Sequence, residues 1–326
     1  MMIRGRGIQD AGSCGFRRRE TLQFICDMER IKGIIPPAVT PLKGNDELDR
    51  EGAERLIEHM IAGGVHALFL LGTTGESQSL SYRLRYEYVK EACRQVDGRV
   101  PVLVGVSDTS LEESVRLARH AAECGAAGVV ATAPYYFAPS QSDLVGYYSA
   151  LADESPLPVY LYNMPSHVKV FLEVPTVVRL ADHKNIAGLK DSSANMNYFQ
   201  TLLHLLGGRD DFELYMGPEE LTGEAVLSGA AGGVNGGANM FPELYVAMYD
   251  AAVAGDLAKM KELQSRIMEI STTVYTVGSY LQGLKGALSL LGLCDGYIAW
   301  PYRQFEGAQR DKLRAVLEEL GCEVKA

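Results

Sequence analysis

The feature that most constrains this chain is a repeated alternation of short apolar runs and longer amphipathic runs, which begins near residue 33. The short runs are rich in β-branched residues and predict strands, whereas the longer runs have the 3.6-residue period of helices. Helical patterns such as "DREGAERLIEHMIAGG" end at glycine, as helices commonly do. The predicted strands are residues 34–40, 67–71, 102–106, 128–131, 159–162, 186–190, 213–216 and 233–235.

Eight successive strand–helix units favour an α/β fold of the (β/α)8 TIM-barrel type over a doubly wound sheet. A dinucleotide-binding sheet would need G-x-G-x-x-G after its first strand, but "TPLKGND" follows here. Four more helical patterns follow the eighth strand, and a barrel needs only one of them. We therefore expect an N-terminal extension over residues 1–30, a catalytic barrel over 31–254 and an appended C-terminal helical bundle over 255–326.

Composition argues against several classes of partner. The formal net charge is −10 and the basic residues beyond residue 30 are dispersed, so no patch for nucleic acid is expected. No apolar run is long enough to span a membrane. The six cysteines contain no C-x-x-C and the six histidines no H-E-x-x-H. These patterns predict a cytoplasmic protein with reduced thiols, no metal and no cofactor.

The first residues differ from the rest of the chain. "MMIRGRGIQDAGSCGFRRRE" carries five arginines and lacks the apolar stretch of a secretory signal. An Arg-rich transit peptide, a loose arm, or a start codon assigned too early with Met28 as the true start are the alternatives.

Lys190 ends the sixth predicted strand, directly after the apolar residues 186–189. Barrel active sites lie at the carboxyl ends of the strands, so the strand places this lysine at the site. A lysine in apolar surroundings can be a neutral amine, which attacks a carbonyl group to form a Schiff base. The alternative is a surface lysine that pairs with Asp191.

Tyr162 and the loop after the second predicted strand are the other candidates. Tyr162 lies 28 residues before Lys190, so it should end the adjacent strand, where a phenol can relay protons. The alternative is a core tyrosine. In the turn "GTTG", residues 72–75, backbone N–H groups and two hydroxyls could hold a carboxylate. The alternative there is an ordinary capping turn.

Several motifs in order resemble those of a known family. They are "PPAVTPL" (36–42), "GTTGES" (72–77), "PYY" (134–136), "YNMPS" (162–166), "GLKDSS" (188–193) and "AGGVNGGAN" (231–239). Together they are similar to the signatures of the N-acetylneuraminate lyase and dihydrodipicolinate synthase family over about residues 31–320. The resemblance implies a class I enzyme that acts on pyruvate or another 2-oxo acid without a metal.

The resemblance also implies a role for each matching residue. Lys190 is the expected Schiff-base lysine, Tyr162 the proton relay, and Thr73 and Thr74 hold the substrate carboxylate and the relay. Tyr136 is expected to reach the site of a neighbouring subunit in a homotetramer built from dimers, and exposed aromatic residues on a loop favour such a partner surface. The alternative is that Tyr135 and Tyr136 pack on the C-terminal helices of their own chain. The expected additional substrate contacts are Gly72, His167, Val234, Asn235 and Gly236.

His167 is a departure from the synthase pattern. Dihydrodipicolinate synthases carry an arginine at this position, which binds the carboxylate of the aldehyde substrate, whereas this chain has a histidine. We therefore expect an aldolase or lyase that joins pyruvate to an aldehyde, or splits the product, and prefer a 2-keto-3-deoxy sugar acid aldolase. The alternatives are 4-hydroxy-tetrahydrodipicolinate synthase and a non-catalytic binding barrel.

Overall fold

Eight parallel strands form the centre of the computed structural model, which describes residues 30–305 and 307–325. Their order in the sheet is β1, β10, β9, β8, β7, β6, β5 and β4. All eight lie within or next to the predicted segments. They are β1 (Gly33–Ile34), β4 (Leu68–Leu70), β5 (Val102–Gly105), β6 (Gly128–Thr132), β7 (Val159–Asn163), β8 (Ile186–Asp191), β9 (Glu213–Met216) and β10 (Gly232–Gly233).

Hydrogen bonds join the two edges of this sheet and close the barrel. The Phe69 N–H donates to the Pro36 carbonyl at 3.0 Å, and the Ala38 N–H donates to the Phe69 carbonyl at 2.9 Å. The (β/α)8 prediction is therefore confirmed. The first strand is shorter than the predicted 34–40, because the prolines at positions 36 and 37 have no N–H to donate to a regular ladder.

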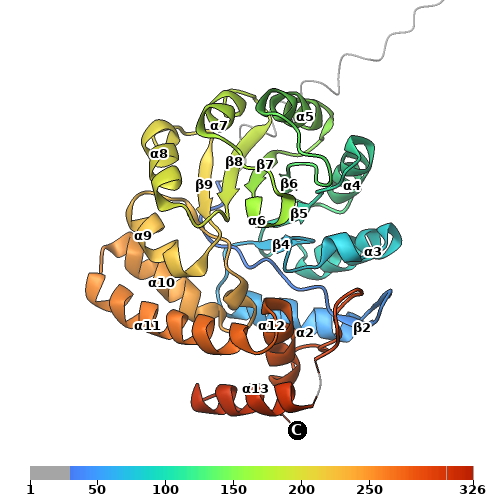
Figure 1. Ribbon diagram of the computed structural model, residues 1–326, viewed down its shortest axis with the longest axis vertical. Coiled ribbons are helices and arrows are strands. Elements are labelled where there is room, and N and C mark those ends of the chain that lie inside the picture. The colour runs from blue at the N-terminus through green and yellow to red at the C-terminus, as the bar shows by residue number, and fades with distance from the viewer. Residues whose placement is uncertain (1–29, 306, 326) are drawn as a thin grey trace, which may run out of the picture. The chain divides into compact units, whose positions relative to one another are not determined.

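Helices surround the strands (Figure 1). Those that follow the strands are α2 (Arg50–Ala62), α3 (Tyr82–Val96), α4 (Leu111–Glu123), α5 (Gln141–Glu154), α7 (Val174–Leu180), α8 (Met196–Leu206), α9 (Thr222–Leu227) and α10 (Pro242–Ala254). Serines begin several of them: Ser81 accepts from Leu84 N–H, and Ser140 forms a capping box with Asp143. The elements that were not predicted include the hairpin of β2 (Leu42–Gly44) and β3 (Glu47–Leu48) and the short helix α6 (Pro165–Val168).

Side chains alternate between the two faces of each barrel strand. Phe69, Leu103, Val130 and Tyr160 belong to one buried cluster, while their strand neighbours, such as Leu68, pack in the larger cluster with the helices. This alternation follows from the two-residue period of a strand. It also places Tyr162 with the first cluster, inside the barrel.

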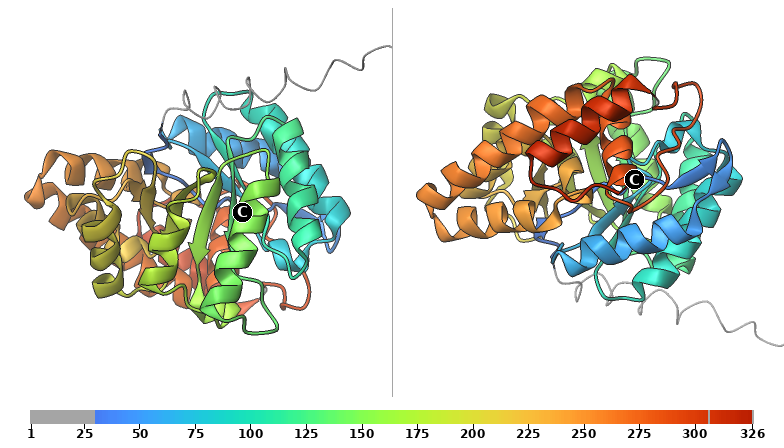
Figure 2. Two further views of the ribbon diagram at one scale, coloured as in Figure 1. Left: turned by 90° about the horizontal axis from the view of Figure 1, so that it is seen from above. Right: turned by 90° about the horizontal axis from the view of Figure 1, so that it is seen from below.

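The C-terminal part of the chain forms the helices α11 (Leu257–Thr273), α12 (Tyr280–Leu290) and α13 (Ala308–Glu319), which lie together (Figures 1 and 2). Leu284 of α12 and Leu313 of α13 belong to the same hydrophobic core as the outer faces of the barrel strands. Residues Ile31–Ala326 accordingly group into one compact unit. The expected extension over residues 1–30 lies outside the described residues, apart from Arg30.

Two features are absent from the described residues. None of the helices within them combines the length and the apolar character needed to cross a membrane. No three His, Cys, Asp or Glu side chains within them gather into a group able to hold a metal ion.

Candidate active site

Lys190 and Tyr162 meet at the ends of two adjacent strands. Tyr162 of β7 and Lys190 of β8 are direct partners in the parallel ladder, so both side chains point into the barrel. Lys190 Nζ lies 4.1 Å from the centroid of the Tyr162 ring and 5.2 Å from that of Phe69. Only 6% of Lys190 is exposed. The lysine therefore lies among aromatic faces, which also attract its charged form.

Asp191 does not pair with Lys190. Its carboxylate accepts hydrogen bonds from Asn163 Nδ2 at 2.8 Å and Ser193 Oγ at 2.9 Å, and the residue is fully buried. Consecutive residues of a strand point to opposite faces, so Asp191 faces outward from the barrel. The alternative in which Lys190 is a surface charge beside Asp191 is therefore wrong.

The Tyr162 hydroxyl lies in a polar setting inside an apolar barrel. It is 3.3 Å from Thr73 Oγ1, which comes from the loop after β4. Burial raises the pKa of Tyr162, but the charge of Lys190 and the hydrogen bond with Thr73 outweigh it. A hydrogen bond with Ser192 acts in the same direction, and the net result is a lowered pKa. A phenol with a lowered pKa is better suited to exchange protons near neutral pH.

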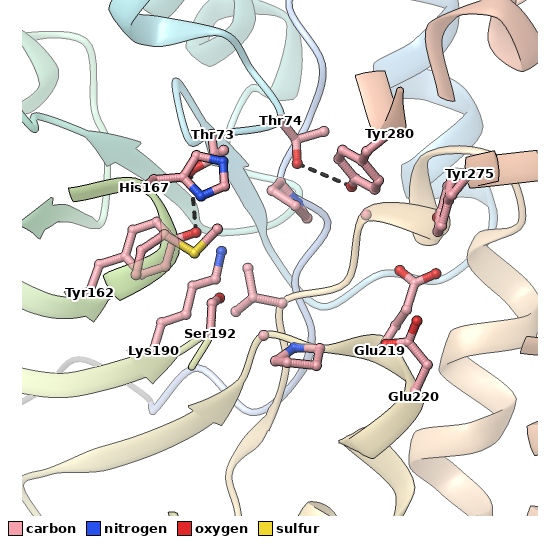
Figure 3. Close-up of a pocket in the computed structure, with 16 residues that line it drawn as sticks. Thr73, Thr74, Tyr162, His167, Lys190, Ser192, Glu219, Glu220, Tyr275 and Tyr280 are labelled. Atoms are coloured by element: carbon pink, nitrogen blue, oxygen red, sulfur yellow. Dashed lines mark hydrogen bonds between the residues drawn. The ribbon is translucent and has the colours of Figure 1, made fainter. Parts of the chain in front are cut away.

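A cavity of about 330 Å³ opens in front of these side chains (Figure 3). Lys190 points toward Tyr162 and Thr73 on one side, while Glu219, Glu220 and Tyr275 lie on the other. Tyr280 of α12 closes the upper side, with its hydroxyl 3.3 Å from Thr74 Oγ1. The lining residues are Pro37, Thr73, Thr74, Tyr162, Met164, His167, Lys190, Ser192, Gly217, Pro218, Glu219, Glu220, Val234, Gly236, Tyr275 and Tyr280.

Glu219 and Glu220 were missed in the sequence analysis. They follow β9 in the segment "GPEE", residues 217–220, so the rule that barrel sites lie at strand ends could have found them. Glu219 accepts hydrogen bonds from the Gly237 N–H and the Tyr245 hydroxyl, both at 2.8 Å. Burial raises the pKa of Glu219 to about 7, although both hydrogen bonds lower it. The far side of the cavity thus carries an acid that titrates near neutral pH.

His167 lies at the cavity, on the short helix α6. Its Nδ1 is 3.0 Å from Ser166 Oγ. Burial lowers the pKa of His167, and the charges of Lys169 and Lys190 lower it further. The imidazole is therefore mostly neutral at pH 7. No arginine is among the described residues that line the cavity.

The structure does not bring all predicted residues together. Val234 and Gly236 line the cavity, but Gly72 and Asn235 do not. Asn235 is fully buried and donates to Thr222 Oγ1 at 2.8 Å, so its amide binds neighbouring protein groups instead of facing the cavity. A side chain at Gly72 would meet the Phe69 ring, which explains why this position lacks one.

Tyr136 lies outside the cavity and is 90% exposed. Its ring contacts Phe137 edge to face, with ring centroids 5.1 Å apart, and its φ is 90°. Tyr135, Tyr136 and Phe137 line a separate groove that His167 also borders. Within this chain, Tyr136 therefore does not reach Lys190.

Known proteins share both sequence and fold with this chain. The model of the Dihydrodipicolinate synthetase family matches residues 30–320. This chain belongs to that family. A 4-hydroxy-tetrahydrodipicolinate synthase of Geobacter metallireducens is 34% identical over 288 residues, which cover 88% of this chain and 98% of the relative. A probable 2-dehydro-3-deoxy-D-pentonate aldolase, YjhH of Escherichia coli K12, is 33% identical and covers 90% of this chain and 99% of its own length.

Solved structures of the family agree with the fold. A dihydrodipicolinate synthase from Bacteroides thetaiotaomicron has a TM-score of 0.87 and 55% identity, over 90% of this chain and all of that chain. YagE of Escherichia coli K12, solved in complex with pyruvate, has a TM-score of 0.85 and 30% identity, over 90% of this chain and all of that chain. As a dihydrodipicolinate synthetase family member, this chain is an enzyme of the lyase and aldolase type. The alternative of a non-catalytic binding barrel is thereby set aside.

Proposed function

We propose that this enzyme is a class I aldolase that joins pyruvate to a neutral polyhydroxy aldehyde, or splits the resulting 2-keto-3-deoxy sugar acid, through a Schiff base on Lys190. The observation that carries this proposal is the contrast between the two sides of the cavity. A buried lysine lies among aromatic rings on one side, and two carboxyl groups without an arginine lie on the other. The relatives include synthases and a probable aldolase, and YagE has been solved with pyruvate.

The lysine amine starts the reaction. The lone pair of Lys190 Nζ attacks the keto carbon of pyruvate, and the carbinolamine loses water to form an imine. Loss of a proton from the adjacent methyl group gives an enamine, whose carbon attacks the aldehyde carbonyl and forms the new carbon–carbon bond. The aldehyde oxygen takes up a proton, and water then hydrolyses the imine to release the product and free Lys190.

Tyr162 and the threonine loop serve these proton transfers. The Tyr162 hydroxyl is near Lys190 and hydrogen-bonded to Thr73, so it can carry protons to and from the carbinolamine and the aldehyde oxygen. We assign Thr74 and the loop N–H groups to the carboxylate of pyruvate, because backbone donors and hydroxyls can bind an anion without a fixed charge. Ser192, which lies beside Tyr162, is a further hydroxyl available to the substrate.

The far side of the cavity favours an aldehyde with hydroxyl groups. The carboxyl groups of Glu219 and Glu220 line this side. Each oxygen of Glu219 already accepts one hydrogen bond from the protein, but a carboxyl oxygen has a second lone pair, which a substrate hydroxyl can use. A carboxylate on the aldehyde would be repelled there, and a mostly neutral His167 offers no permanent charge to hold it.

The second candidate is 4-hydroxy-tetrahydrodipicolinate synthase. It is favoured by the 55% identity to the Bacteroides thetaiotaomicron synthase and by the synthases among the relatives. Its aldehyde, aspartate semialdehyde, bears a carboxylate. The deciding experiment measures kcat/KM with pyruvate and either glyceraldehyde or aspartate semialdehyde, and identifies each product by mass spectrometry. A higher kcat/KM for aspartate semialdehyde would contradict the aldolase proposal and support the synthase.

We also infer that the protein is a homo-oligomer, because aromatic side chains on the loop around Tyr136 are exposed. Two neighbouring aromatic side chains, Tyr136 and Phe137, are 90% and 82% exposed, which is unfavourable in water unless a partner covers them. A tetramer built from dimers with Tyr136 at a neighbour's site remains our prediction, and light scattering that finds a fully active monomer would contradict it. A cytoplasmic location also remains a prediction, and the free cysteines among the described residues fit it.

A further inference from the structure

The loop between β4 and α3 holds the two active-site threonines in an unfavourable backbone. Leu71 and Glu76, on either side of Thr73 and Thr74, both have φ of 56°. Residues other than glycine rarely adopt this left-handed conformation, and it persists only where the surroundings impose it. Some contact outside the loop must therefore fix its shape.

Glu76 makes that contact from inside the protein. Its Oε1 lies 2.6 Å from Lys285 Nζ, and its Oε2 accepts a hydrogen bond from the Ala299 N–H at 2.9 Å. The side chains of Glu76 and Lys285 are 1% and 0% exposed. Residues 76 and 285 are far apart in sequence, so this buried ion pair joins the loop to the C-terminal helix α12.

Lys285 uses its other protons on backbone carbonyls. It donates to Thr40 O at 2.9 Å and to Tyr297 O at 2.5 Å. Thr40 in turn donates through its hydroxyl to the Gly75 carbonyl at 2.7 Å. The ammonium therefore supports the loop twice, directly through Glu76 and indirectly through Thr40.

The same helix touches the cavity itself. Tyr280, at the start of α12, lies 3.3 Å from Thr74 Oγ1. A buried ion pair is weak evidence for stability, because apolar residues of similar volume often stabilise a core as well or better. Glu76 lies three residues after Thr73, and Lys285 lies on the helix that contacts Thr74. The position of the pair therefore points to a role in shaping the active site.

We propose that Glu76 and Lys285 are positioning residues, which hold the loop so that Thr73 stays at the Tyr162 hydroxyl and Thr74 stays at the cavity. The inference rests on the proposed function, since it takes Tyr162 and Thr73 as the proton-transfer pair. According to this inference, α12 shapes the active site although it does not supply the reacting amine.

Two matched double variants test this inference. Glu76→Gln with Lys285→Met removes both charges and keeps an acceptor for Ala299. Asp108→Asn with Arg85→Met removes both charges of a second buried ion pair and keeps an acceptor for the Ser110 N–H. In this pair Arg85 Nη1 lies 3.3 Å from Asp108 Oδ2, and the two side chains are 8% and 7% exposed. The side-chain hydrogen bonds of Arg85 and Asp108 join them to each other and to residues 80, 82, 109 and 110, and none of these bonds goes to residues 72–76, so their variant is the control for loss of a buried ion pair.

We expect kcat with pyruvate and glyceraldehyde to fall about 10- to 100-fold in the first variant and to stay within about 3-fold in the control. The pH–rate limb of Tyr162 should shift to higher pH only in the first variant, because the Thr73 hydrogen bond lowers the pKa of Tyr162. Backbone hydrogen exchange in residues 71–77 should speed up only there. Equal activity and exchange in both folded variants would overturn the inference.

A third variant covers poor folding of the first. Glu76→Asp keeps both charges but shortens the tether by one methylene, and it should show the same shift in exchange and in the pH–rate limb. Unchanged kcat and exchange in this variant would also overturn the inference. If the wild-type enzyme forms no imine with pyruvate, the proposed function fails, and hydrogen exchange then decides by itself whether the pair holds the loop.

Discussion

The two sides of the cavity differ in how the chain builds them. Lys190 and Tyr162 come from neighbouring strands, where backbone pairing sets their spacing. Glu219 lies on a short 3-10 helix (Glu219–Leu221) after β9, and Tyr275 and Tyr280 come from the C-terminal part of the chain. The side built on strands carries the amine and the phenol, and in the proposed reaction the other side meets the aldehyde. The comparison suggests that the chemistry is rigidly placed, whereas the choice of aldehyde depends on parts that can vary.

The two sides also differ in electrostatics. The strand side combines one amine with the rings of Phe69 and Tyr162. The opposite side holds Glu219, whose pKa burial raises to about 7, and its neighbour Glu220. If this division is correct, variants on the strand side should abolish turnover of every aldehyde, and variants on the other side should change selectivity or pH dependence.

The largest expected effect is that of Lys190→Met. Methionine fits the apolar surroundings but has no amine, so no Schiff base can form. We expect no pyruvate adduct after borohydride reduction and no turnover of either aldehyde. Mass spectrometry maps the adduct, with Lys259→Met, an exposed change on α11, as the control that keeps it. An adduct on a different lysine of the wild-type enzyme would show that Lys190 is not the nucleophile.

Tyr162→Phe should have the next largest effect. A positioned proton-transfer group typically contributes about 10²- to 10⁴-fold in rate, so kcat should fall by this factor with both aldehydes. Tyr160→Phe is the matched control, since it removes a buried hydroxyl from the same strand and should keep most of the turnover. A wild-type kcat in Tyr162→Phe would show that Tyr162 is a core tyrosine with no part in proton transfer.

Glu219→Gln tests the opposite side through stability. The pKa of Glu219 is raised in the folded state from 4.5 to about 7, so the folded protein holds this proton more tightly than the unfolded chain does. The resulting stabilisation is present at pH below 4.5 and is lost as the pH rises to about 7. Urea unfolding should show the wild type losing about 3 kcal/mol relative to Glu219→Gln across this window. If the free energy of unfolding changed with pH in the same way in both proteins, the raised pKa of Glu219 would be contradicted.

His167→Arg should have the smallest effect, confined to one aldehyde. A guanidinium at this position can bind a carboxylate through two parallel hydrogen bonds. A hydrogen bond to a charged group contributes about 1.5 to 3 kcal/mol, so kcat/KM for aspartate semialdehyde should rise about 10- to 150-fold. The value for glyceraldehyde should change little. An equal change for both aldehydes would mean that His167 does not contact the part of the substrate that distinguishes them.

Local patterns in the sequence were sufficient for the barrel and for one side of its site. Parallel strands end at one edge of the barrel, so the 28-residue spacing between Tyr162 and Lys190 predicted that these side chains would meet, as they do. The same reasoning failed at Asn235, because its place after β10 did not reveal that Thr222 would take up its amide. It also overlooked Glu219, although this residue follows a strand that the periodicity had located.

Only the tertiary structure decided the rest of the site. Tyr280 and Thr74 are 206 residues apart, and Lys285 and Glu76 are 209 residues apart. The apolar pattern of α12 predicted a helix but could not say which side of the barrel would receive it. Hydrogen bonds and ion pairs over such separations form only when the C-terminal helices pack on the barrel core, and no local period encodes that packing. The amino-acid sequence by itself thus determined the barrel and the meeting of Lys190 with Tyr162, whereas packing between distant segments decided what surrounds them.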